Sequence, residues 1–95
     1  MMCGGFGQVR EVNDDIRSEL QSLKQSIEQK LNYQFTVFEP LHYKSQVVAG
    51  SNFMVKIKVD GEKFIHVKYH RPLPCNGNQL VLMDASAGHT LESAI

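Results

Sequence analysis

The sequence predicts an α+β domain in which one long helix packs across a four- to five-stranded antiparallel sheet. One stretch near the N-terminus has apolar residues at helical spacing, and most of the remaining chain alternates apolar and polar residues as strands do. An Asp-Gly pair separates two of the alternating stretches, as expected for a hairpin. A helix lying on one face of a sheet buries both apolar surfaces, so this arrangement is the simplest one for the pattern.

Length and charge limit what the chain can be. With 95 residues it has the size of a single domain, 1–95, with room for one core. Its 10 Lys and Arg residues are balanced by 10 Asp and Glu residues, so we expect neither a nucleic-acid nor a membrane partner. No apolar run reaches the about 18 residues that a spanning helix needs. Residues 1–7 lack the basic and apolar regions of a signal peptide, so a cytoplasmic location is expected.

The two cysteines are expected to be free thiols. Cys3 lies in the Gly-rich stretch 1–7, which we interpret as a flexible N-terminal arm, and nothing near Cys75 indicates an oxidising compartment. Cys-x-x-Cys and His-x-x-x-His spacings are missing, and no acid is placed to orient a catalytic base. We therefore expect no metal, no cofactor, no catalytic residue and no enzyme. The histidines are interpreted as surface residues: His42, His66, His70 and His89.

The helix is expected over residues 13–31. Asn13 can cap its first turn, and Asp14 and Asp15 place negative charge at the end of the helix dipole that favours it. The apolar residues that follow are spaced by 4, 3, 4 and 4 positions and so share one helical face: Ile16, Leu20, Leu23, Ile27 and Leu31.

Alternating stretches predict the strands. The first runs from Gln34 to Tyr43 and contains Pro40, which cannot donate a ladder hydrogen bond, so a bulge or an edge position is expected there. The other strands are expected over residues 53–59, 63–70 and 79–84, with a C-terminal tail at 85–95.

Charge decides the register of the hairpin around Asp60 and Gly61. A two-residue loop would place Lys58 directly opposite Lys63, and facing like charges are unfavourable. A loop one residue longer, with a Gly-containing bulge, pairs Val59 with Lys63 instead. This register leaves one apolar face for the helix and one polar face that carries Lys56, Lys58, Phe64, His66, Lys68 and His70.

The turn between the first two strands has an unusual composition. Turns are commonly built from polar residues, Gly and Pro, yet Gln46-Val47-Val48-Ala49-Gly50 places three apolar residues where the chain should reverse. Such a tip is either buried as a β-arch or exposed as a binding edge.

These five residues resemble the Gln-x-Val-x-Gly first binding loop of the cystatins, which inhibit papain-like cysteine proteases. The chain also has a Met-Cys-Gly start, one long helix, the stretch FEPLHYKSQVVAGSNF over residues 38–53 and a later Leu73-Pro74 turn. This order and spacing are similar to those of the stefins, the single-domain, disulfide-free, intracellular branch of that family. The resemblance covers residues 1–83.

The resemblance implies a reversible, tight and competitive inhibitor that blocks the protease cleft with a wedge and does no chemistry itself. The family's wedge combines an N-terminal arm with two hairpin loops. The residues implied to bind the protease are Cys3, Gly4, Gln46, Val47, Val48, Ala49, Gly50, Leu73, Pro74 and Cys75. The implied partners are proteases of the cathepsin class, and we expect a monomer that can exchange strands into a dimer.

The chemistry of the first loop agrees with this implication. Val47, Val48 and Ala49 would each contribute about 1 kcal/mol or more when buried in an apolar groove. Gly50 lets the backbone approach a partner closely and adopt a φ that a β-branched residue resists. Gln46 can hydrogen-bond to the backbone and hold the loop in shape. We expect Gly50→Arg to weaken binding strongly while leaving the fold largely intact.

Two regions depart from the stefin pattern. Cys75 stands where stefins commonly have a His after the Leu-Pro pair. The tail 85–95 is shorter and less aromatic than the family's, so its packing on the sheet stays open. Leu91 and Ile95 are the residues that could anchor it.

The polar sheet face allows a second interpretation. Lysines with an aromatic residue on an open sheet resemble a platform for single-stranded nucleic acid, and a scaffold protein could also keep this fold. Phe64 by itself offers little stacking, so a solvated face rich in lysine is the favoured interpretation.

Overall fold

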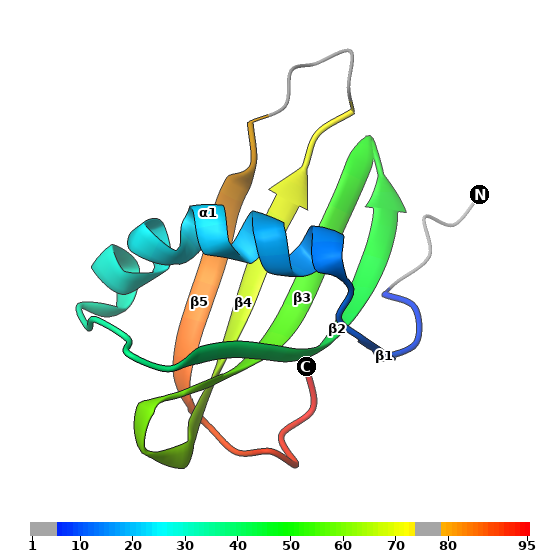
Figure 1. The fold of residues 1–95 in the computed structure, drawn as a ribbon. Coiled ribbons are helices and arrows are strands. Elements are labelled where there is room, and N and C mark those ends of the chain that lie inside the picture. Colours follow the sequence, from blue (N-terminus) through cyan, green and yellow to red (C-terminus); the bar gives the residue numbers. More distant parts are fainter. Residues whose placement is uncertain (1–5, 74–78) are drawn as a thin grey trace.

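One α-helix crosses one face of a five-stranded antiparallel sheet in the computed structural model, which describes residues 6–73 and 79–95 (Figure 1). The strands lie in chain order, and this arrangement confirms the predicted fold class. The elements are β1 (Arg10–Glu11), α1 (Asp14–Leu31), β2 (Phe38–Val48), β3 (Gly50–Val59), the 3₁₀ turn Asp60–Glu62, β4 (Lys63–Arg71) and β5 (Val81–His89). The predicted site residues outside the described ranges are Cys3, Gly4, Pro74 and Cys75.

The helix α1 begins and ends as the sequence predicts. The side-chain oxygen of Asn13 accepts a hydrogen bond from the backbone N–H of Ile16 at 2.9 Å, so Asn13 is the N-cap. At the other end Asn32 adopts a left-handed conformation with φ 55°, and the N–H of Tyr33 donates to the carbonyl of Glu28. The buried helix residues are Ile16, Leu20, Leu23 and Ile27.

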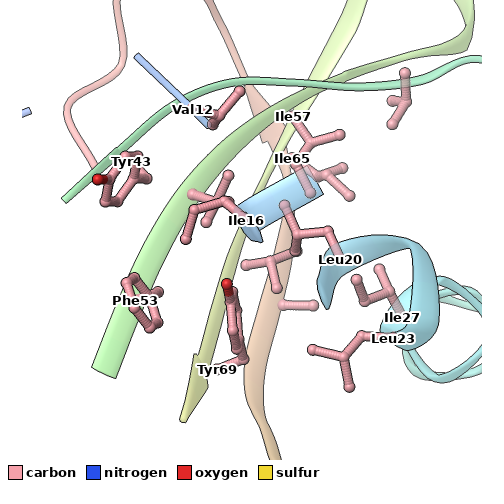
Figure 2. Packing of buried hydrophobic residues seen from close by; sticks show 14 of the residues in the cluster. Val12, Ile16, Leu20, Leu23, Ile27, Tyr43, Phe53, Ile57, Ile65 and Tyr69 are labelled. Atoms are coloured by element: carbon pink, nitrogen blue, oxygen red, sulfur yellow. The ribbon is translucent and has the colours of Figure 1, made fainter. Parts of the chain in front are cut away.

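The core lies between α1 and one face of the sheet. In Figure 2 the side chains of Ile16 and Leu20 lie among those of Ile57 and Ile65 from the strands. The aromatic rings of Phe53 and Tyr69 stack with their centroids 5.1 Å apart. The apolar stripes predicted for the helix and for the strands are therefore buried against each other.

The predicted register of the β3–β4 hairpin is confirmed. Val59 pairs with Lys63 across a three-residue turn in which Gly61 has a φ of 71°. The pairing continues with Ile57 and Ile65, Val55 and Val67, and Phe53 and Tyr69. In β2 the register shifts between Pro40 and His42, which confirms the bulge expected at the proline.

The first predicted strand starts too early in the chain. Residues 34–37 alternate in polarity but lie outside the sheet, and β2 begins at Phe38. The carboxylate of Asp60 accepts the backbone N–H groups of Thr36 and Val37. These amides are therefore satisfied by a side chain and need no neighbouring strand.

The polar face of the sheet is partly covered, which corrects two predictions. Lys56 is only 3% exposed and His66 only 6% exposed, so the lysine-rich face is not an open platform and His66 is not a surface residue. β5 continues to His89, beyond its predicted end at residue 84. The chain that follows turns back from the lower end of β5 toward the other strands (Figure 1).

The C-terminal segment packs on the sheet through Lys56. The ammonium group of Lys56 donates to the carbonyl oxygens of Thr90, Leu91 and Ser93 at 2.7, 2.5 and 2.6 Å. An ammonium group has three donors, and all of them find acceptors here, which compensates for the burial of its charge. Leu91 is 52% exposed, which contradicts its expected role as an apolar anchor, whereas Ile95 is partly buried.

Candidate functional site

The hairpin between β2 and β3 ends in an exposed apolar tip. Strand pairing continues up to Val48 and Gly50, so only Ala49 lies between the two strands. Val47 is 80% exposed and Ala49 is exposed as well, while Val48 is partly buried. The tip is therefore a projecting edge and not a buried β-arch. It lies at the end of the sheet where β4 also ends (Figure 1).

The geometry of the hairpin requires a glycine at position 50. Gly50 has a φ of 107°, and a Cβ on it would lie 2.4 Å from the carbonyl oxygen of Arg71. A side chain at this position would strain the backbone and force β3 away from β4. The close backbone approach that the sequence suggested for Gly50 is therefore one to Arg71 of β4, within the protein itself. The expectation that Gly50→Arg leaves the fold largely intact is wrong for this reason.

A row of polar side chains crosses three strands beside the tip. Gln46 of β2 lies opposite Asn52 of β3, which in turn lies opposite His70 of β4. The amide nitrogen of Asn52 donates to the side-chain oxygen of Gln46 at 3.2 Å. The side-chain oxygen of Asn52 lies 2.8 Å from Nδ1 of His70. Gln46 therefore steadies the hairpin, and it does so in part through the side chain of Asn52 on the facing strand.

Asn52 and His70 were missed by the sequence analysis as members of the site. The predicted strand register could have revealed them, because it places both residues on the same face of neighbouring strands. The pattern did not reveal that their side chains would meet, because hydrogen bonding depends on side-chain conformation.

β4 is held against the helix just before the second loop. Arg71 binds both carboxylate oxygens of Glu19, at 2.6 and 2.7 Å, and its guanidinium lies 4.6 Å from the ring centroid of Phe53. The hydroxyl of Tyr69 donates to the same carboxylate at 2.8 Å. Hydrogen bonding to Glu19 raises the pKa of Arg71, and burial, followed by the bond to Glu19, raises the pKa of Tyr69.

Leu73 represents the second loop among the described residues. It follows β4 at the end of the sheet that carries the tip, and its side chain is 42% exposed. The strand pair Ser51 and Arg71 connects β3 and β4 between the tip and this residue. β4 therefore ends beside the tip at the same end of the sheet (Figure 1), and Leu73 follows two residues after it.

The first described residues of the chain lie beside the same hairpin. The N–H of Gly7 donates to the carbonyl of Ser45 at 2.9 Å. The ring of Phe6 lies 5.3 and 5.7 Å from the ammonium groups of Lys44 and Lys68. The described chain thus begins next to the segment that leads into the tip.

The site is an edge rather than a pocket. An apolar hollow of about 250 Å³ lies at the opposite end of β3, where it is lined by Leu31, Phe35, Val59 and Phe64 among others. Among residues 6–73 and 79–95, no group of three or more His, Cys, Asp or Glu side chains is placed to hold a metal ion. No helix in this part of the chain combines the length and the apolar character needed to cross a membrane.

The chain is similar to cystatins over nearly its whole length. Residues 4–91 match the family model described as Cystatin domain. Cystatin-B of Oplegnathus fasciatus is 32% identical over 95 residues, which cover 100% of this chain and 95% of the relative. Cystatin-A of Felis catus is 33% identical over 88 residues, covering 93% and 90% of the two chains. Stefin-C of Bos taurus is 33% identical over 79 residues, covering 83% and 78%.

Proposed function

This chain belongs to the cystatin family, in its stefin branch, and from that premise we propose that it is a reversible, tight and competitive inhibitor of papain-like cysteine proteases. The family consists of inhibitors of cysteine proteases, so the chain is a protease inhibitor and not an enzyme. In the proposed mechanism it occupies the active-site cleft of the protease and carries out no bond-breaking step itself.

The observation that carries the proposal is the exposed apolar tip. Val47 is 80% exposed on an edge that projects from the end of the sheet. Burial of its side chain against a partner is favourable by about 25 cal/mol for each Å² of apolar surface that is removed from water. A protease cleft is concave and partly apolar, so a narrow convex edge is complementary to it.

The proposed wedge has three parts. They are the tip Gln46–Gly50, the second loop with Leu73, Pro74 and Cys75, and the N-terminal arm with Cys3 and Gly4. The hydrogen bond between Gly7 and Ser45 supports the inclusion of the arm, because the described chain starts next to the tip. Three short segments are enough for an interface of roughly 1,600 Å² in total.

The shape of the tip also accounts for inhibition without cleavage. Strand pairing up to Val48 and Gly50 holds the segment as a closed hairpin. A substrate must present an extended segment in the cleft, and the hairpin would have to lose these pairs to do so. Because the tip is already ordered, little conformational entropy is lost on binding, which favours tight binding.

The proposed partners are proteases of the cathepsin class. We propose that the inhibitor binds them as a monomer and that it is located in the cytoplasm. Only Ala49 separates β2 from β3, so opening this turn would join the strands and permit exchange into a dimer. The alternative of a nucleic-acid platform is not supported, because Lys56 and His66 of the polar face are buried.

Titration of active papain with this protein tests the proposed function. We expect the rate of substrate hydrolysis to fall in proportion to added inhibitor and to vanish near equal concentrations. The apparent inhibition constant should rise linearly with substrate concentration, because the inhibitor and the substrate compete. An unchanged rate at a several-fold excess of the protein would refute the proposal.

A matched pair of substitutions tests the role of the tip. Val47→Lys places a charge on the exposed tip, and Val37→Lys makes the same change on a residue that is 42% exposed near the opposite end of β3. We expect Val47→Lys to raise the inhibition constant by about a hundredfold, because apolar burial is lost and a charge must be desolvated. Val37→Lys should inhibit like the wild type. Equal inhibition by both variants would place the binding edge elsewhere.

A further inference from the structure

We propose that Asn52 and His70 are positioning residues that hold the tip Gln46–Gly50 and Leu73 in one fixed arrangement. This inference rests on the proposed function, because it concerns how the inhibitor presents its edge. It assigns a role to the polar row beside the tip, whose members need not touch the protease.

The hydrogen bonds fix the part that each group plays. The amide nitrogen of Asn52 donates to Gln46, so the amide oxygen of Asn52 is the acceptor that faces the imidazole of His70. Nδ1 of His70 must therefore carry a proton and donate it. The neutral Nδ1–H tautomer and the protonated ring both meet this requirement, so the link does not depend on the charge of His70.

The same imidazole supports the tip directly. A Cβ on Gly50 would lie 3.0 Å from Cε1 and 3.1 Å from Nε2 of His70, so the ring fills the space beside the glycine. Asn52 fixes the orientation of the ring by binding its Nδ1 at 2.8 Å. Together these contacts join the end of β2 to β4 across β3.

The row also connects the tip to Leu73 at the end of β4. His70 is followed by Arg71, which is fixed to the helix by Glu19, and Leu73 comes two residues later. A shift of β3 against His70 would change the spacing between the tip and Leu73. In the proposed function the tip and Leu73 enter the same cleft together. If the spacing between them changed, one of the two would lose its contacts with the protease.

The location of the row separates positioning from stability. Asn52 and His70 are partly buried and lie on the face of the sheet away from the helix, whereas the core residues Phe53 and Tyr69 lie on the other face. Removal of either polar side chain leaves the apolar core unchanged. The effect should therefore be larger on inhibition than on unfolding.

Substitution of His70 gives the sharpest test. We expect His70→Ala to raise the inhibition constant for papain about tenfold while the midpoint of urea unfolding changes little. His70→Asn places an amide N–H near the position of Nδ1 and should restore most of the inhibition, although it lacks the ring atoms that lie beside Gly50. His70→Gln places its amide near the position of Nε2 and should not restore it. This contrast reports the hydrogen bond to Asn52 and not the size of the side chain.

A double-mutant cycle tests whether the two residues act as a unit. The free-energy loss of inhibition in the double variant Asn52→Ala, His70→Ala should be smaller than the sum of the two single losses, because both changes remove the link between Asn52 and His70. His89→Ala is the matched control, since it removes a 2.8 Å contact between His89 and Ser86 away from the tip. We expect this control to inhibit like the wild type.

The outcomes distinguish this inference from the proposed function. If the wild type fails to inhibit papain, the proposed function falls and the inference falls with it. If the wild type inhibits and His70→Ala inhibits equally well, the inference alone is overturned. Equal rescue by His70→Asn and His70→Gln, or additive effects in the cycle, would also overturn it. A loss of inhibition matched by a loss of folding in urea would show a merely structural role and would contradict it as well.

Discussion

The two turns at the ends of β3 reverse the chain with opposite chemistry. At one end Asp60, Gly61 and Glu62 form a polar turn, with positive φ at the last two residues. At the other end Val48-Ala49-Gly50 reverses the chain with apolar residues and a φ of 107° at the glycine. The polar turn has the composition that folding favours, whereas the apolar turn leaves Val47 and Ala49 exposed to water. This difference agrees with the proposed role of the apolar turn in binding a protease.

Substitution of the two turn glycines should give the largest difference in the free energy of unfolding. A Cβ on Gly61 would meet only the end of the Lys63 side chain at 4.0 Å, whereas a Cβ on Gly50 would lie 2.4 Å from the backbone oxygen of Arg71. We expect Gly50→Ala to lower the free energy of unfolding by about 4 kcal/mol, from backbone strain and overpacking together. Gly61→Ala should lower it by about 1 kcal/mol, from the left-handed conformation only. Urea unfolding measures both, and equal losses would contradict the comparison.

His66, on β4 beside the strand that joins the two turns, is expected to make the stability depend on pH. The ring of His66 stacks on that of His89, with the centroids 3.7 Å apart. Burial, followed by the charges of His89, Lys56 and Lys44, lowers the pKa of His66 from 6.5 to about 4. The folded protein therefore binds this proton less readily than the unfolded chain. The contribution of neutral His66 to stability is fully present above pH 6.5 and is lost as the pH falls toward 4.

We expect the protonation of His66 to lower the free energy of unfolding by up to about 3 kcal/mol when the pH is brought from neutral to acidic values near its folded pKa. Urea unfolding at both pH values measures the change. His66→Phe keeps an aromatic ring but binds no proton, and carboxylates titrate in both proteins, so the difference between the two isolates His66. The same pH dependence in both proteins would show that His66 does not contribute.

The side chain of Asp60 in the polar turn should have a smaller effect than either Gly50 or His66. Asp60→Ala removes the acceptor of the backbone N–H groups of Thr36 and Val37, which lie in an exposed region. We expect the free energy of unfolding to fall by about 1.5 kcal/mol, and by less in Asp60→Asn, which keeps one acceptor oxygen. Inhibition of papain should stay at the wild-type level, because this turn lies at the end of β3 away from the tip. A raised inhibition constant would mean that the polar turn also takes part in binding.

Features that depend on neighbours in sequence could be predicted. The cap at Asn13 and the register that keeps Lys58 away from Lys63 both follow from residues a few positions apart. The tip Gln46–Gly50 was found for the same reason, because its composition is anomalous within a single turn.

Features that depend on distant residues could not be predicted. Alternation places Lys56 on the polar face, but its acceptors come from a segment 34 to 37 positions later. The contact between Arg71 and Glu19 joins residues 52 positions apart. Periodicity tells which side of a sheet a residue faces, and it does not tell what covers that side.

The burial of Lys56 gives the protein an internal reporter. Amine-modifying reagents require an accessible nitrogen with a free lone pair, and Lys56 offers neither while its buried ammonium group donates to the three carbonyls. Lys58, two residues along the same strand, is only partly buried and serves as the internal reference for labelling. The ratio of modification at these two lysines, read by peptide mass, would therefore count the molecules whose C-terminal segment has lifted off the sheet.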